Sequence, residues 1–71
     1  MILNSGDIVS YSGEYNNCHG HKYKIVKIYP NVFGVDIWYD LESVHPNLMT
    51  HYKVLLSVEI KDIKLWKNLN N

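Results

Sequence analysis

The segment Cys18-His19-Gly20-His21 holds the side chains with the most reactive chemistry in this sequence. A thiolate and two imidazoles are ligands that Zn²⁺ prefers, and His45 or His51 has the chemistry to complete a tetrahedral site from another loop. The spacing matches no recognised zinc motif, because a zinc knuckle is marked by a Cys-x-x-Cys pair. We therefore expect no metal and no cofactor, and we favour polar loop residues beside a half-buried thiol.

Catalysis by this segment lacks supporting groups in the sequence. A Cys18 nucleophile would need a base, a residue that orients the base and a preorganised oxyanion site, and no pattern specifies them. The carboxylates of Asp36, Asp40 and Glu42 fall on one side of an alternating segment, which is typical of the solvated face of a strand. The four glycines are scattered, so they form no phosphate-binding loop. We expect a protein that is not an enzyme.

Two tryptophans are the strongest candidates for a binding surface. The same alternation places Trp38 on the polar side of its strand, and it also places Trp66 outward. Tryptophan and tyrosine dominate interface energetics, so we expect another protein as the partner. The expected partner-binding residues are Trp38, Trp66, Tyr15, Asp36 and Asp40. The alternative is that neighbouring segments cover both indoles.

The lysines define a second, nucleic-acid interpretation. The chain has no arginine and a formal net charge of +0, so it lacks the overall positive charge of most nucleic-acid-binding domains. Two local groups of lysines remain, and Lys27 joins the first only if a bulge turns it to the same face. The alternative binding residues are Lys22, Lys24, Lys61, Lys64 and Lys67.

The length and the cysteine content limit the class of protein. With 71 residues the chain has room for one domain, which we place at residues 1–66, followed by a tail at residues 67–71 that we expect to fray. A single cysteine cannot form an intramolecular disulfide, which favours a reducing compartment and a cytoplasmic protein. No apolar run is long enough to cross a membrane.

Alternation of apolar and polar residues predicts an all-β fold that positions these candidates. The expected strands cover residues 6–13, 22–29, 35–42, 52–58 and 63–66, with a 3₁₀ turn at residues 59–62. A change of parity between Ile25 and Val26 predicts a bulge or strong bend in the second strand, or burial of both its faces, rather than a flat strand.

The direction of each side chain follows from the same alternation. In the first strand we expect Val9 and Tyr11 to face inward. In the third strand the expected inward residues are Val35, Ile37, Tyr39 and Leu41. In the fourth they are Tyr52, Val54, Leu56 and Val58, and in the last they are Ile63 and Leu65.

Two patterns resemble a known fold family. The patterns Gly6-Asp7-x-Val9-x-Tyr11 and Val58-x-x-x-Asp62-Ile63-x-Leu65 look like those of SH3-like barrels, which include KOW-type domains and small prophage-borne proteins. The resemblance runs from Gly6 to Trp66 and implies a small five-stranded barrel with one 3₁₀ turn before the last strand. The Ala-Leu-Tyr-Asp-Tyr segment and Trp-Trp pair of peptide-binding SH3 domains are absent, so the resemblance does not imply recognition of proline-rich peptides.

Low-GC codon usage is suggested by the absence of Arg, Ala and Gln and the abundance of Asn, Lys, Ile and Tyr. Together with the small size, this composition resembles that of phage or prophage accessory proteins of low-GC Gram-positive bacteria. That resemblance implies a small cytoplasmic protein that binds a host or defence factor.

Overall fold

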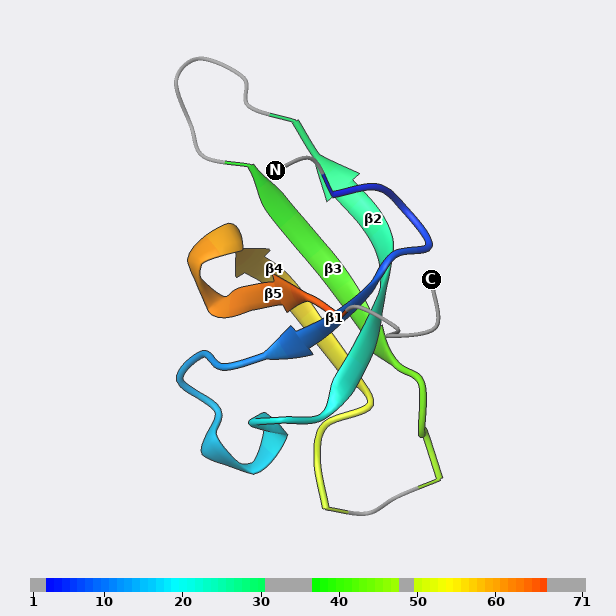
Figure 1. The fold of residues 1–71 in the computed structure, drawn as a ribbon, viewed down its shortest axis with the longest axis vertical. Coiled ribbons are helices and arrows are strands. Elements are labelled where there is room, and N and C mark those ends of the chain that lie inside the picture. Colours follow the sequence, from blue (N-terminus) through cyan, green and yellow to red (C-terminus); the bar gives the residue numbers. More distant parts are fainter. Residues whose placement is uncertain (1–2, 31–36, 48–49, 67–71) are drawn as a thin grey trace.

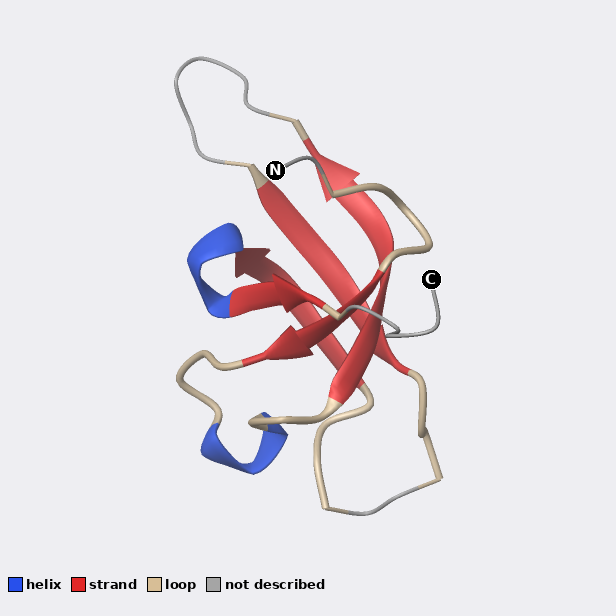
Figure 2. Cartoon of the chain, in the orientation of Figure 1, coloured by secondary structure: helices blue, strands red, loops and turns tan. Residues whose placement is uncertain are grey.

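The computed structural model of the chain describes residues 3–30, 37–47 and 50–66. Its elements are β1 (Ile8–Tyr11), η1 (Asn16–Cys18), β2 (Lys22–Tyr29), β3 (Trp38–Ser43), β4 (Val54–Glu59), η2 (Ile60–Asp62) and β5 (Ile63–Leu65). The η elements are single 3₁₀ turns, and the described residues contain no α-helix (Figure 2). The all-β class and the 3₁₀ turn before the last strand are confirmed, whereas η1 lies in a stretch expected to be plain loop.

The strands form one antiparallel sheet in the order β4-β3-β2-β1-β5. Figure 1 shows β2 curving strongly through the middle of the molecule, with η2 connecting β4 to β5. In the part of the chain that the structure describes, no ladder joins β4 to β5, so the sheet curls like a small barrel without closing. This leaves β4 and β5 as the two edge strands.

The inner face of the curled sheet holds the core. Val9 and Tyr11 are buried as expected, and so are Tyr39, Leu41 and Ile63. The complete buried apolar cluster comprises Leu3, Val9, Tyr11, Cys18, Tyr23, Ile25, Tyr39, Leu41, Leu55, Val58 and Ile63, with Ile28 and Leu65 packed against it. β-branched and aromatic residues on one face of each strand therefore account for most of the core.

Two bulges flank β3 at the same level. On one side Leu41 pairs with Ile25 and Asp40 pairs with Lys27, which leaves Val26 as an extra residue in β2. On the other side Leu41 pairs with Leu55 and Tyr39 with Val58, so that β4 has an extra residue in the same stretch. A bulge at this position was one of the predicted alternatives. It turns Lys27 to the outer face, where its side chain is exposed, and it turns the next residue, Ile28, inward against the core.

The expected inner face of β4 is wrong. Leu55 is 4% exposed and points inward, whereas Leu56 is 69% exposed, and Tyr52 and Val54 are also exposed. Val58 is buried as expected, because the bulge between Leu55 and Val58 changes the parity of the strand. The expected alternation therefore holds at Val58 but is reversed from Val54 to Leu56.

In β3 the expected faces are only partly correct. Ile37 is exposed and precedes the strand, although we expected it to face the core. Asp40 was expected in water, but its side chain is buried because residues of the two flanking strands cover and bond it. Trp38 is half-buried rather than fully exposed. Val35, Asp36 and the tail at residues 67–71 lie outside the described residues.

None of the described segments forms a helix of the length and apolar character that a membrane crossing requires.

Candidate functional site

The buried carboxylate of Asp40 joins three strands on the outer face of the sheet. Only 8% of this residue is exposed. Its Oδ2 accepts a hydrogen bond of 2.6 Å from the Tyr29 hydroxyl at the end of β2, and its Oδ1 accepts one of 3.0 Å from the backbone N–H of Ser57 in β4. Both donors come from the bulged strands, so this side chain holds the two neighbours of β3 together.

The backbone at Ser57 has an uncommon conformation. Its φ of 55° lies in the left-handed region, and it is the only non-glycine residue with positive φ in the described part of the chain. This conformation costs an L-residue about 1–2 kcal/mol. The bond from Ser57 N–H to Asp40 compensates part of that cost. Bulges and strained residues of this kind gather at binding sites, where they redirect side chains.

A hollow of about 430 Å³ opens beside this carboxylate and is lined by Tyr29, Trp38 and Ser57. Tyr29 and Trp38 are direct partners in the ladder between β2 and β3, so their rings are neighbours on the outer face. Most of the wall is apolar because it consists of these two rings. The volume lies within the range of roughly 300–1,000 Å³ that is typical of ligand pockets. We call this hollow the Trp38 pocket.

Acidic groups surround the Trp38 pocket. The hydrogen bond to Asp40 raises the pKa of the Tyr29 hydroxyl, because a neighbouring carboxylate opposes formation of phenolate. Glu59 lies directly opposite Trp38 in the ladder between β3 and β4. Lys27, the ladder partner of Asp40, is a cation beside the pocket, with its Nζ 4.9 Å from the centre of the Tyr29 ring.

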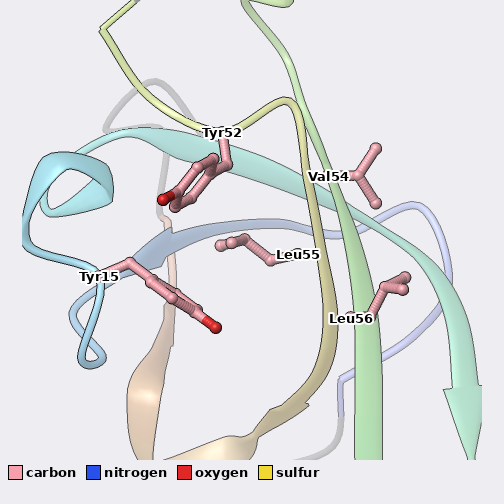
Figure 3. A pocket seen from close by; sticks show the side chains of 5 residues that line it. All are labelled: Tyr15, Tyr52, Val54, Leu55 and Leu56. Atoms are coloured by element: carbon pink, nitrogen blue, oxygen red, sulfur yellow. The ribbon is translucent and has the colours of Figure 1, made fainter.

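A second hollow follows the free edge of β4. It measures about 350 Å³ and is lined by Tyr15, Tyr52, Val54, Leu55 and Leu56. Figure 3 shows Tyr15, Tyr52 and Leu55 on one side of the strand, with Val54 and Leu56 on the other. The rings of Tyr15 and Tyr52 meet edge to face, with 5.4 Å between centroids. We call this hollow the β4 groove. Leu56 of the β4 groove and Ser57 of the Trp38 pocket are consecutive residues of β4.

The predicted partner-binding residues are distributed over three places. Trp38 and Asp40 are brought together at the Trp38 pocket, and Tyr15 lies in the β4 groove. Trp66 is 42% exposed, as expected, but it follows β5 at the other edge of the sheet, where the Lys22 Nζ lies 4.2 Å from the centre of its ring. Asp36 lies outside the described residues.

Part of the predicted lysine surface does form. Lys22 of β2 and Lys64 of β5 both pair with Ser10 of β1, so the two lysines lie on either side of Ser10. Lys24 lies two residues beyond Lys22 in β2. Glu42 pairs with Lys24 and adds an acidic group to the same face. Lys61 points elsewhere and forms an exposed ion pair of 3.7 Å with Glu59. Lys67 lies outside the described residues.

The metal candidates diverge. The Cys18 thiol is buried in the core, whereas the His19 Nε2 contacts the carbonyl oxygen of Gly13. The His21 ring turns away and stacks on His51, with 3.9 Å between centroids. Within residues 3–30, 37–47 and 50–66, no three His, Cys, Asp or Glu side chains are grouped so as to hold a metal ion.

Sequence reasoning did not select Tyr29 or Ser57, which line the Trp38 pocket together with Trp38 among the described residues. Tyr29 could have been found from its place at the end of the strand that precedes Trp38 in the chain. Ser57 carries no sequence signal, because serine does not mark a left-handed backbone as glycine does.

Comparison of the chain with known protein families, curated proteins and solved structures gives no match. The functional assignment therefore depends on the geometry of the two hollows.

Proposed function

We propose that this chain is a small non-catalytic module that binds another protein along β4. The observation that carries the proposal is the Trp38 pocket, a hollow walled by two aromatic rings at a bulge that a buried carboxylate maintains. Aromatic side chains in well-packed hollows supply much of the binding energy at protein interfaces. Such a site requires no reacting group.

The β4 groove extends the same surface. Tyr15, Tyr52, Val54 and Leu56 are all exposed and apolar or aromatic, and they gather along one unpaired strand edge. Proteins usually protect an exposed edge with charges, and an apolar edge is a typical site for contact with another chain. We propose that one partner covers both hollows, because β4 contributes residues to each of them.

Affinity capture from a host extract tests this function. The immobilised wild-type protein is compared with Trp38→Ala and, as a matched control, with Trp66→Ala, which removes the same side chain at the other edge of the sheet. We expect one captured protein, identified by mass spectrometry, to be lost with Trp38→Ala and retained with Trp66→Ala at moderate salt. Equal capture by all three proteins would contradict the proposal.

Nucleic-acid binding is the second candidate function, and it would use a different face. The row Lys22–Ser10–Lys64 and the adjacent Trp66 combine positive charge with an exposed ring, as single-strand-binding surfaces do. The neighbouring Glu42 and the net charge of +0 weaken this attraction, so we favour the protein partner. Retention on heparin at low salt that falls steeply with added salt would reverse this preference.

We further propose that the fold belongs to the SH3-like barrels, which is supported by the strand order and by η2 before β5. A cytoplasmic setting and a phage or prophage origin, with a host or defence factor as the partner, are proposals supported only by the lone cysteine and by composition.

A further inference from the structure

The walls of the Trp38 pocket indicate which chemistry it prefers. Tyr29 and Trp38 contribute aromatic faces, which carry partial negative charge above and below the ring. Tyrosine and tryptophan faces attract ammonium and guanidinium groups within about 6 Å of the ring centre. Lys27 already demonstrates this attraction in the chain itself, since its Nζ lies 4.9 Å from the centre of the Tyr29 ring.

Carboxylates behind and beside the rings add charge of the same sign. Asp40 is bonded to Tyr29 and Ser57, which both line the pocket, and both donors are neutral. Lys27 is the partner of Asp40 in the ladder between β2 and β3, but its Nζ extends over the Tyr29 ring and forms no ion pair with this carboxylate. In residues 3–30, 37–47 and 50–66, no lysine or histidine nitrogen comes within 4.0 Å of this carboxylate. Glu59, opposite Trp38, forms only an exposed pair with Lys61. The surroundings of the pocket are therefore complementary to a cation.

We propose that the Trp38 pocket receives the charged end of a lysine or arginine side chain of the protein partner. This inference rests on the proposed function and specifies the chemistry at one of its two hollows. The alkyl stem lies against the Trp38 and Tyr29 rings, and the cationic head lies near Asp40 and Glu59. A volume of about 430 Å³ accommodates either head group.

The test uses the full chain with Trp66→Phe, so that Trp38 is the single tryptophan and reports binding by fluorescence or by its indole N–H signal in NMR. The probes are Nα-acetyl-lysine methylamide and Nα-acetyl-arginine methylamide. Nα-acetyl-norleucine methylamide is the matched neutral control, because it keeps the apolar stem and lacks the charge. We expect saturable millimolar binding of the two cations, at least about fivefold tighter than that of the neutral probe. Equal binding of all three probes would overturn the proposal.

Variants separate charge from shape. Glu59→Gln and Asp40→Asn are expected to weaken the binding of both cations by about threefold or more. Glu42→Gln is the control: Glu42 lies on the same strand as Asp40 but is exposed and does not line the pocket, so its replacement should leave the binding unchanged. Circular dichroism establishes that each variant is folded, and Glu59→Gln decides the matter if Asp40→Asn does not fold. Unchanged affinity in a folded Glu59→Gln and in a folded Asp40→Asn contradicts the proposal.

The remaining outcomes distinguish this inference from the proposed function. Choline serves as a free small cation: if it binds and the two amino-acid probes do not, the pocket takes a small ligand and the proposal fails. If no cation binds but Trp38→Ala still abolishes capture of a partner, the binding module stands and only the assignment of a basic side chain is lost. Failure of both experiments rejects the site altogether.

Discussion

The hydroxyl of Tyr29 donates a 2.6 Å hydrogen bond to the buried carboxylate of Asp40. Tyr29 lies in β2 and Asp40 in β3, and the same carboxylate accepts a bond from the backbone N–H of Ser57 in β4. A single acidic side chain therefore fixes two residues that line the Trp38 pocket, Tyr29 and Ser57. The shape of the Trp38 pocket is therefore coupled to stability at this point, because loss of the carboxylate would remove the bonds to both flanking strands.

Replacing Asp40 by alanine is expected to lower the free energy of unfolding by about 2–4 kcal/mol, because it leaves the Tyr29 hydroxyl and the Ser57 N–H without their charged acceptor. Urea denaturation followed by circular dichroism measures the change. Glu42→Ala is the matched control on the same strand; since Glu42 is exposed, its effect should stay within about 0.5 kcal/mol. Equal effects of the two substitutions would show that the carboxylate of Asp40 does not hold the strands.

Ser57→Gly is expected to stabilise the fold by about 0.5–1 kcal/mol, because glycine adopts a φ near 55° without the steric cost that serine carries. Ser57→Val should destabilise it by about 1–2 kcal/mol, since a β-branched residue is least tolerant of this conformation. Both variants keep the backbone N–H that donates a hydrogen bond to Asp40. A glycine variant less stable than the wild type would contradict the strained bulge.

Neighbouring leucines in β4 test the corrected direction of its side chains. Leu55→Ala removes a side chain that is packed in the core and should cost about 2–4 kcal/mol. Leu56→Ala removes an exposed side chain and should change stability by no more than about 0.5 kcal/mol. Thermal or urea unfolding of the two variants gives the comparison directly. The reverse order of effects would restore the face that simple alternation predicted.

The success of sequence reasoning depended on where the strands were regular. Val9 and Tyr11 were assigned correctly because β1 contains no extra residue, so its alternation survives from end to end. In β4 the alternation of Leu56 was misleading, because pairing with β3 requires an additional residue beside Ser57. A bulge whose backbone bonds to a side chain 17 residues away leaves no mark in the local pattern.

The candidate site could be predicted only in part for a related reason. Alternation correctly placed Trp38 and Asp40 on the same outer face. It could not show that Tyr29 and Ser57 close over Asp40 and bury it, since that contact joins residues 11 and 17 positions away. A residue on the outer face of a strand is exposed only if no side chain or backbone of a neighbouring strand covers it, and both cover Asp40.

His51 makes the stability of this protein sensitive to pH. The ring is buried, and a 2.6 Å hydrogen bond joins its Nε2 to the Ser43 hydroxyl oxygen, which also accepts a bond of 3.0 Å from His45 N–H. Burial, His21 stacked on the ring and nearby His45 lower the pKa of His51 below its usual 6.5. The unfolded chain therefore takes up this proton at a higher pH than the folded chain does.

We expect the free energy of unfolding to be greatest above about pH 6.5. It should fall as the pH decreases from there towards the lowered pKa of His51. The slope from this one proton is at most about 1.4 kcal/mol per pH unit. Urea unfolding at pH 7.5, 6.5, 5.5 and 5.0 measures the slope. His51→Phe keeps a ring that stacks on His21 but cannot be protonated, so its slope should be smaller than that of the wild type. His19→Asn is the control, because His19 contacts Gly13 and Tyr11 rather than the His21–His51 stack, and it should keep the wild-type slope. Identical slopes in the wild type and His51→Phe would mean that other groups carry the acid sensitivity.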